Sequence, residues 1–221
     1  MMITGGRVTE PKYPPDAYRG FRASLADWFI GVGLSSELER AIQELELKAG
    51  DCVLDAACGP GFNIERLVRA VGPDGLVVAV EDNPHLLARA EQKVKRRGWD
   101  NVRLLDDIDP SRIERTPVDG VVVSFNPPIL LQRHDLLLAA WELLKPGGRI
   151  AMAAARNTTA AGRLLGAPFL RASLWLLGHP GDYHYWTVHE PWQHLRELSS
   201  DQLWVERRVL GMHYILWAEK P

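Results

Sequence analysis

Two glycines and two carboxylates in the first half of the chain have the types and spacing of a ligand site. Asp55 follows the apolar run of residues 52–54, and Gly59 and Gly61 come four and six residues later. Glycine lets a ligand lie against the backbone, where a Cβ would collide with it. Glu81 ends a second apolar run about 20 residues further on, where dinucleotide sites place the acid that binds a ribose. The types and spacing of these residues predict a ligand site where the two apolar runs end.

The same loop argues against two other kinds of chemistry. A dinucleotide-binding loop needs a third glycine in Gly-x-Gly-x-x-Gly, and Ile64 occupies that position. Cys58 lies inside the loop without a histidine partner in sequence, so we interpret it as a packing residue and not a nucleophile. With Cys52 as the only other cysteine, a disulfide framework is excluded.

Histidine spacing gives no reason to expect a metal. Four histidines recur at five-residue steps: His179, His184, His189 and His194. That step puts neighbouring side chains on different faces of a helix and on opposite faces of a strand. We therefore expect no metal site.

Composition limits the functional class. The 221 residues are 46% hydrophobic and 24% charged, with a net charge of −2, which is the balance of a globular protein without the basic surface of a nucleic-acid binder. The first 15 residues lack the apolar stretch of a signal peptide. The longest apolar segment, 164–178, contains Arg171 and is shorter than the roughly 20 residues of a membrane helix. We expect a soluble, cytoplasmic protein without a membrane span.

Strand and helix patterns alternate between residues 51 and 155. Strands are predicted at 52–57, 76–81, 102–105, 120–125 and 149–154, with helices at about 63–71, 84–97 and 135–144. Such alternation implies βαβ units and a parallel sheet covered on both faces. Asn83-Pro84 suits the start of the second helix, and Gly98 suits its end.

The flanking segments have other patterns. Aromatic residues at three- and four-residue steps predict an amphipathic helix at 18–30. Ser36 and Glu39 form a candidate capping box for a helix that ends near Leu47. Strands at about 203–209 and 212–219 are close enough in sequence to form an antiparallel pair at one edge.

We divide this single domain into four parts. Residues 1–48 form an N-terminal helical cap, 49–155 a ligand-binding core, 156–192 a cover, and 193–221 a closing helix and strand pair. The cover segment is rich in proline, tryptophan, tyrosine and histidine. An irregular segment of this length inside a compact domain is more often a functional cover than neutral filler. The alternative is a hydrophobic patch that packs on the sheet.

Taken in order, six segments resemble the class I S-adenosylmethionine-dependent methyltransferases. They are Asp55-x-x-x-Gly59-x-Gly61 and residues 78–81, 83–87, 104–108, 119–125 and 143–149. The resemblance covers about residues 51–155. It implies a Rossmann-like, doubly wound α/β fold whose mostly parallel seven-stranded sheet ends in an antiparallel edge pair, with a helical and irregular cap.

The resemblance also implies S-adenosylmethionine as the cofactor and assigns roles around it. Glu81 would accept the ribose hydroxyls, and Gly59 and Gly61 would let the amino-acid part approach the backbone. Asp55 would meet the cofactor's ammonium, or pin the loop by backbone hydrogen bonds. Asp82 would lie near the adenine, and Asp106 or Asp107 would accept from its amino group, with Asp107 favoured. Further candidates for cofactor binding are Ala57, Asn63, Ile108, Ser124 and Asn126.

The acceptor is less constrained. Asn126-Pro127-Pro128 resembles the Asn-Pro-Pro-aromatic motif of enzymes that methylate nitrogens in nucleic acids and proteins, but Ile129 replaces the aromatic residue. We therefore expect in-line methyl transfer to a small, apolar or aromatic molecule, on oxygen or nitrogen, with no nucleic-acid partner. The alternatives are an N-methyltransferase acting on RNA or protein, and an inactive regulatory domain that binds S-adenosylmethionine. The acceptor and the oligomeric state stay open.

Segments 18–30 and 156–192 are expected to fold over the carboxyl ends of the strands as a largely apolar chamber. Histidine suits a general base for a hydroxyl acceptor, and His184 is favoured over His179. Candidate acceptor-binding residues are Tyr18, Phe21, Trp28, Pro127, Arg156 and Tyr183. The basic run of Lys93, Lys95, Arg96 and Arg97 is expected to complement a helix dipole.

Overall fold

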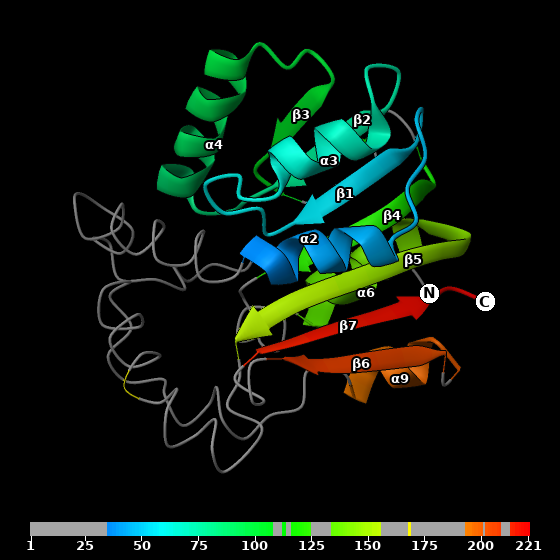
Figure 1. The fold of residues 1–221 in the computed structure, drawn as a ribbon. Coiled ribbons are helices and arrows are strands. Elements are labelled where there is room, and N and C mark those ends of the chain that lie inside the picture. The colour runs from blue at the N-terminus through cyan, green and yellow to red at the C-terminus, as the bar shows by residue number, and fades with distance from the viewer. Residues whose placement is uncertain are drawn as a thin grey trace.

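A seven-stranded sheet organises the chain. The computed structural model describes residues 35–107, 112–113, 116–124, 134–155, 168, 193–200, 202–208 and 213–221. The strands are β1 (Cys52–Ala56), β2 (Leu76–Val80), β3 (Val102–Leu105), β4 (Val118–Ser124), β5 (Leu144–Ala155), β6 (Leu203–Arg208) and β7 (His213–Glu219). Their order across the sheet is β3-β2-β1-β4-β5-β7-β6 (Figure 1). Five neighbouring strands are parallel, and β7 runs antiparallel to both β5 and β6. The predicted fold class is confirmed.

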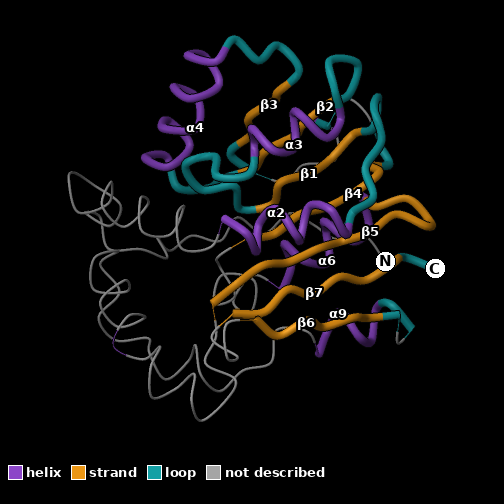
Figure 2. The backbone as a smooth tube through the Cα atoms, in the orientation of Figure 1, coloured by secondary structure: helices purple, strands orange, loops and turns teal. Residues whose placement is uncertain are grey.

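Helices cover both faces of this sheet (Figure 2). They are α2 (Ser35–Glu44), α3 (Ile64–Val71), α4 (Pro84–Arg97), α6 (His134–Leu143) and α9 (Gln193–Leu198). Residues of α2, α3 and α4 pack with Val53 and Val122 on one face, whereas residues of α6 and α9 pack with Leu54 and Val121 on the other. Adjacent strand residues therefore serve different faces, which explains why the central strands are continuously apolar.

The predicted ends of α4 are confirmed. The Asn83 side chain accepts hydrogen bonds from the backbone N–H groups of His85 and Leu86, at 2.9 and 3.3 Å, and Pro84 is the first helical residue. Gly98 ends the helix in the left-handed region, at φ 65°. Both ends follow from the local sequence because each capping group lies within four residues of the groups it binds.

The capping box predicted for α2 is wrong. The helix begins at Ser35 and ends at Glu44, so Ser36 already lies inside it. The Ser36 hydroxyl donates to Glu37 at 2.8 Å, while Glu39 accepts from Arg66 of α3 at 3.1 Å. The contact with α3 takes the Glu39 carboxylate that a capping box would need.

The carboxyl ends of β1 to β5 lie at the same end of the sheet, because these strands are parallel. We call this end, where the strands finish, the carboxyl edge of the sheet. Open α/β sheets bind ligands in this position. Since β7 is antiparallel to β5, its first residue, His213, lies at that edge, opposite Ala155. None of the helices in the described part of the chain has the length and apolar character needed to cross a membrane.

Candidate active site

The loop between β1 and α3 uses its two glycines differently. Gly59 and Gly61 have φ values of 58° and 85°, in the region that favours glycine. A Cβ added at Gly61 would lie 2.9 Å from Cδ1 of Ile64, so the backbone of this glycine packs against a side chain of the protein. A Cβ at Gly59 would meet no atom of the described residues within 4 Å. Those residues therefore leave space beside the Gly59 backbone that a ligand can enter.

Glu81 joins this loop to the start of α4. Its carboxylate is 5% exposed and accepts from the backbone N–H of Gly59 at 2.8 Å and from that of Asn83 at 2.9 Å. Burial raises the pKa of Glu81 to about 7, against these two hydrogen bonds and assisted by the charge of Asp82. Each carboxylate oxygen accepts one of these two bonds and has a second acceptor position. The predicted contact with ribose hydroxyls stays a prediction, and the loop-anchoring role is an addition to it.

Asp55 belongs to a buried polar network with Asn63 and Ser124. The Asn63 amide nitrogen donates to Oδ1 of Asp55 at 3.1 Å and to the Ser124 hydroxyl at 2.9 Å. Asp55 thus contacts the loop through the Asn63 side chain, whereas we expected backbone hydrogen bonds in that role. Burial raises the pKa of Asp55 to about 7, although the Asn63 hydrogen bond and the charge of Lys93 oppose the shift.

Two acceptors in this network are unmatched. Oδ2 of Asp55 and Oδ1 of Asn63 are buried and have no hydrogen-bond partner among the residues that the structure describes. Leaving such groups unpaired is costly, so unmatched acceptors in a native site call for a donor. An ammonium group supplies up to three donors and a positive charge. The pair therefore fits the amino-acid end of S-adenosylmethionine.

Lys93 contacts the loop, which corrects one expectation. Its ammonium donates to the carbonyl oxygen of Gly61 at 2.5 Å, and burial lowers its pKa. We expected it to complement the α4 dipole with its basic neighbours, but only Lys95, Arg96 and Arg97 lie in the last turn. Lys93 is one helical turn nearer to the site, and its side chain reaches across to the loop.

The remaining acidic candidates are exposed. Arg112 donates to Asp106 at 2.5 Å and to Asp107 at 2.6 Å, and this contact lowers the pKa of Asp106. Because one guanidinium holds both carboxylates, the geometry does not separate them as adenine ligands. Asp82 is exposed next to the buried Glu81.

Cys58 and Ala57 complete the loop. Cys58 is buried in the core cluster on the α3 face, and burial raises the pKa of its thiol well above the ordinary value. A thiol held in the protonated form is a poor nucleophile, which supports the packing role. Ala57 adopts a left-handed conformation at φ 60°, and no signal in the sequence indicated it.

Ten predicted site residues lie outside the described residues: Tyr18, Phe21, Trp28, Ile108, Asn126, Pro127, Arg156, His179, Tyr183 and His184. Their assignments to the adenine, the acceptor and the general base stay predictions.

A charged cluster at the same edge was missed. Nδ1 of His213 lies 3.1 Å from Oε1 of Glu37, and Nε of Arg208 lies 3.8 Å from the same oxygen. The Glu37 side chain is 2% exposed. The predicted strand at 212–219 placed His213 near the start of a strand. Its contact with Glu37, 176 positions earlier, is not indicated by the sequence around either residue.

Known proteins share this fold. A solved S-adenosylmethionine-dependent methyltransferase from Aquifex aeolicus superposes with a TM-score of 0.59 at 22% identity, covering 83% of this chain and 89% of that one. Residues 53–148 match the family model described as a methyltransferase domain, and they contain the glycine loop, Glu81 and Asp107. These residues are a class I methyltransferase domain. S-adenosylmethionine is the cofactor of this family, as the resemblance in sequence implied.

Relatives of the methyltransferase domain differ in their acceptors. A protein-L-isoaspartate O-methyltransferase 2 of Archaeoglobus fulgidus is 31% identical over 149 residues, which is 65% of each chain. A tRNA (adenine(58)-N(1))-methyltransferase of Thermus thermophilus is 40% identical over 87 residues, 38% of this chain and 34% of that one. The chain spans between 33% and 65% of the length of five curated relatives that it matches. Membership of the family therefore leaves the acceptor open.

Proposed function

We propose that this chain binds S-adenosylmethionine at the carboxyl edge of the sheet and transfers its methyl group to a small, apolar or aromatic molecule. The cofactor supplies a methyl group on a positively charged sulfur, which is already a reactive electrophile. Glu81 would hold the ribose, and Asp55 with Asn63 would hold the ammonium. The open space beside Gly59 would admit the part of the cofactor that lies between its ribose and its ammonium group.

The protein's main task in such a reaction is positioning. Holding an acceptor, a methyl group and a sulfur atom in line can contribute up to roughly 7–11 kcal/mol in ideal cases. The glycine loop is fixed from three elements for this purpose, by Glu81 after β2, Lys93 on α4 and Asn63 before α3. A loop held in this way pre-organises the cofactor and loses little entropy on binding.

The observation that favours a small acceptor is the pairing of cations near the carboxyl edge. Three arginines there, within the part that the structure describes, each contact a carboxylate: Arg66 with Glu39, Arg112 with Asp106 and Asp107, and Arg208 with Glu206. A nucleic acid is held mainly by cations that neutralise its phosphates. Cations already neutralised by carboxylates, in a chain of net charge −2, offer little to such a partner.

Methyl transfer from labelled S-adenosylmethionine tests this proposal. The purified chain is incubated with a panel of small phenols, aromatic amines and aliphatic alcohols, and the label is followed into the organic phase. Transfer to at least one panel member, abolished by excess S-adenosylhomocysteine, is the expected result. Cofactor binding in calorimetry without transfer to any of these molecules would contradict the small-acceptor assignment.

A macromolecular acceptor is the second candidate. It is favoured by the protein and tRNA methyltransferases among the relatives and by Asn126-Pro127-Pro128. Labelled transfer to total RNA or to a peptide mixture, with RNA affinity that falls steeply as salt rises, would establish it. An inactive regulatory domain would bind the cofactor and transfer its methyl group to none of these acceptors.

A further inference from the structure

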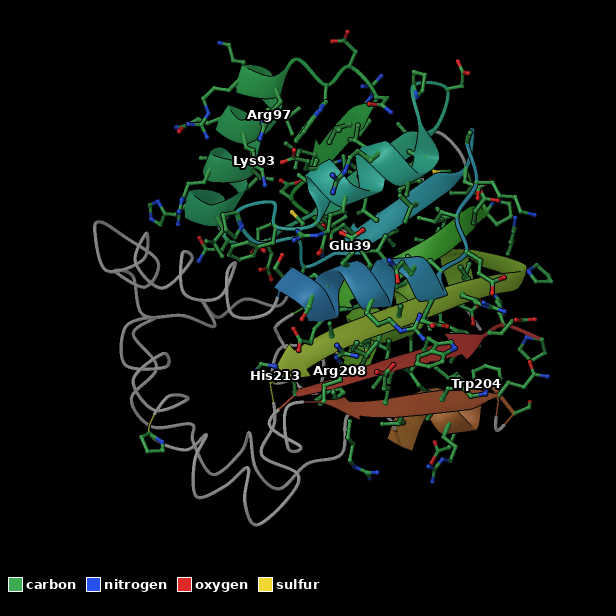
Figure 3. All side chains as sticks on the ribbon, in the orientation of Figure 1. Glu39, Lys93, Arg97, Trp204, Arg208 and His213 are labelled. Atoms are coloured by element: carbon green, nitrogen blue, oxygen red, sulfur yellow. The ribbon has the colours of Figure 1, made fainter. Side chains whose placement is uncertain are left out.

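The contact between Glu37 and His213 lies at the ligand-binding edge of the sheet. His213 is the first residue of β7 and pairs with Ala155, the last residue of β5, and with Arg208, the last residue of β6. Figure 3 shows His213 beside the tip of the β5 arrow, next to Arg208. Glu37 comes from the first turn of α2, the helix that packs on β5 and β7.

This contact and the cofactor network occupy the same face. Val53 and Ile215 belong to the core cluster beneath α2 and α3, and strand side chains alternate between faces. Asp55 and His213, each two residues along from one of these, therefore point to that face as well. Ser124 pairs with Ala153, two residues before the partner of His213. Two strand spacings and two residues separate His213 from Ser124, about 12 Å between Cα atoms.

The Glu37 carboxylate is ionised and orients the imidazole. Burial opposes its ionisation, but hydrogen bonds with Ser36 and His213 outweigh burial and lower the pKa of Glu37. An ionised carboxylate only accepts hydrogen bonds, so the proton of this contact is on Nδ1 of His213. Nε2 then carries the free lone pair, and it has no hydrogen-bond partner among the described residues. A carboxylate that orients histidine in this way also stabilises the imidazolium that forms when Nε2 takes a proton.

The charged side chains around Glu37 and His213 form one network. On α2, Arg40 pairs with Glu44 and reaches Glu206 of β6 at 3.3 Å. Arg208 of β6 pairs with Glu206 at 2.7 Å and approaches Glu37. Three carboxylates, including Glu37, thus surround two guanidinium groups. The carboxylates therefore outnumber the guanidinium groups by one, and the side of the imidazole that faces Glu37 is negatively charged.

We propose that His213, oriented by Glu37, is the general base of methyl transfer, and that the group methylated is therefore a hydroxyl of a small phenol-like acceptor. This inference rests on the proposed function. As the acceptor oxygen forms its bond to the methyl carbon, the bond from that carbon to sulfur breaks and its electron pair stays on sulfur. The acceptor's proton moves to Nε2 of His213 and then to water. No oxidant or metal enters this balance.

Two probes of different acidity test the role of the base. Phenol is protonated near neutral pH and needs a base, whereas 4-nitrophenol is largely ionised at pH 8 and does not. General-base catalysis contributes about 10²–10⁴-fold. In His213→Gln we expect kcat/KM for phenol to fall by at least 100-fold and that for 4-nitrophenol by less than fivefold. Glu37→Gln should show the same selective loss to a smaller extent.

Controls separate this role from a structural one and from failure of the proposed function. Arg207→Gln, one position from Arg208 on an exposed site of β6, should alter neither reaction. Calorimetry with S-adenosylhomocysteine should give both catalytic variants wild-type affinity, which reports an intact cofactor site. An equal loss with both phenols would overturn the base assignment.

The wild-type chain provides two further outcomes. If the variants do not fold, its kcat/KM for phenol should still rise with pH through one ionisation while that for 4-nitrophenol stays flat from pH 8 upward, and a flat phenol profile would overturn the proposal. If the wild-type chain methylates aromatic amines but methylates neither phenol nor 4-nitrophenol, the assignment of a hydroxyl acceptor fails. The proposed function, methyl transfer to a small molecule, then stands.

Discussion

At the scale of single residues, Glu81 illustrates why a binding carboxylate is also a structural one. The carboxylate that we propose as the acceptor of the ribose hydroxyls already accepts from two backbone N–H groups, one in the loop and one at the start of α4. Removing it would alter both the ligand's hydrogen bonds and the shape of the site. A substitution that keeps the shape of the side chain is therefore the informative one.

Glu81→Gln is expected to weaken S-adenosylhomocysteine binding by at least tenfold. Hydrogen bonds to a charged acceptor contribute about 1.5–3 kcal/mol each, and the amide leaves one oxygen and no charge to receive them. Calorimetry measures the change, with Glu91→Gln on the exposed side of α4 as the matched control. Binding within twofold of the wild type would contradict the ribose assignment.

The pH dependence of cofactor binding follows from the two buried carboxyls. In the free protein burial raises the pKa of both Asp55 and Glu81 to about 7, above their ordinary values of 3.8 and 4.5. Binding an ammonium and two hydroxyls requires the ionised forms, so binding releases protons below about pH 7 and affinity falls as the pH falls through that value. We expect S-adenosylhomocysteine to bind at least tenfold more weakly at about pH 5.5 than at about pH 8.

Calorimetry in buffers of different ionisation enthalpy measures the released protons directly. Asp55→Asn cannot ionise at that position, so its affinity should be low and should change less with pH. An affinity of the wild type that is constant over this range would show that neither carboxyl ionises on binding.

At the scale of elements, α4 does more than connect β2 to β3. Its N-terminus is tied to Glu81 through Asn83, and its third turn sends Lys93 to the carbonyl of Gly61. Lys93 makes this contact because of its position in the helix, whereas Lys95, Arg96 and Arg97 lie further from the loop, in the last turn. The helix is thus a brace for the glycine loop.

Lys93→Met is expected to lower cofactor affinity between about threefold and tenfold while leaving the fold intact. The substitution keeps most of the apolar stem of the side chain but removes a charge-assisted hydrogen bond, whose contribution is reduced here by partial exposure. Calorimetry and thermal unfolding measure the two effects, with Lys95→Met as control. A loss of thermal stability without a loss of affinity would assign Lys93 to the core and not to the site.

The limits of sequence reasoning are also visible at this scale. Strands and the caps of α4 were predictable because their determinants are local, as with Asn83, Pro84 and Gly98. The capping box failed because Arg66, 27 residues away, pairs with Glu39. Two contacts join residues far apart in sequence: 32 residues separate Lys93 from Gly61, and 176 separate Glu37 from His213. The sequence around each residue does not indicate its partner. Contacts that depend on the assembled sheet can be read only from the structure.

At the scale of the whole molecule, charge balance bears on the choice of acceptor. The net charge is −2, and three arginines described at the carboxyl edge, Arg66, Arg112 and Arg208, contact carboxylates. These ion pairs reduce the positive field that a polyanion would need at this edge, so we expect recognition there to depend on shape and on individual hydrogen bonds. Such an edge suits a neutral acceptor better than a polyanion.

Methyl transfer to a neutral phenol should change less than twofold between about 50 and 200 mM salt. A reaction that depended on six to ten phosphate contacts would lose about 10³–10⁵ in affinity over the same range. Initial rates at subsaturating acceptor measure the slope, and potassium chloride and sodium chloride should agree. A steep fall with salt would favour the macromolecular acceptor.

The strand order has a consequence for how the protein is made. Because β7 pairs with β5, one side of β5 stays unpaired while residues 156–212 are synthesised. The cofactor half, β1 to β4, can assemble earlier, since its contacts are closer in sequence. An open edge of this kind invites pairing with another chain, so nascent molecules should depend on chaperones most strongly at this stage. In released chains truncated after Ala155, hydrogen exchange should therefore be slower in β1, which is paired on both sides, than in the β5 amides that face the missing β7. The base proposed at His213 would be the last part of the site to arrive.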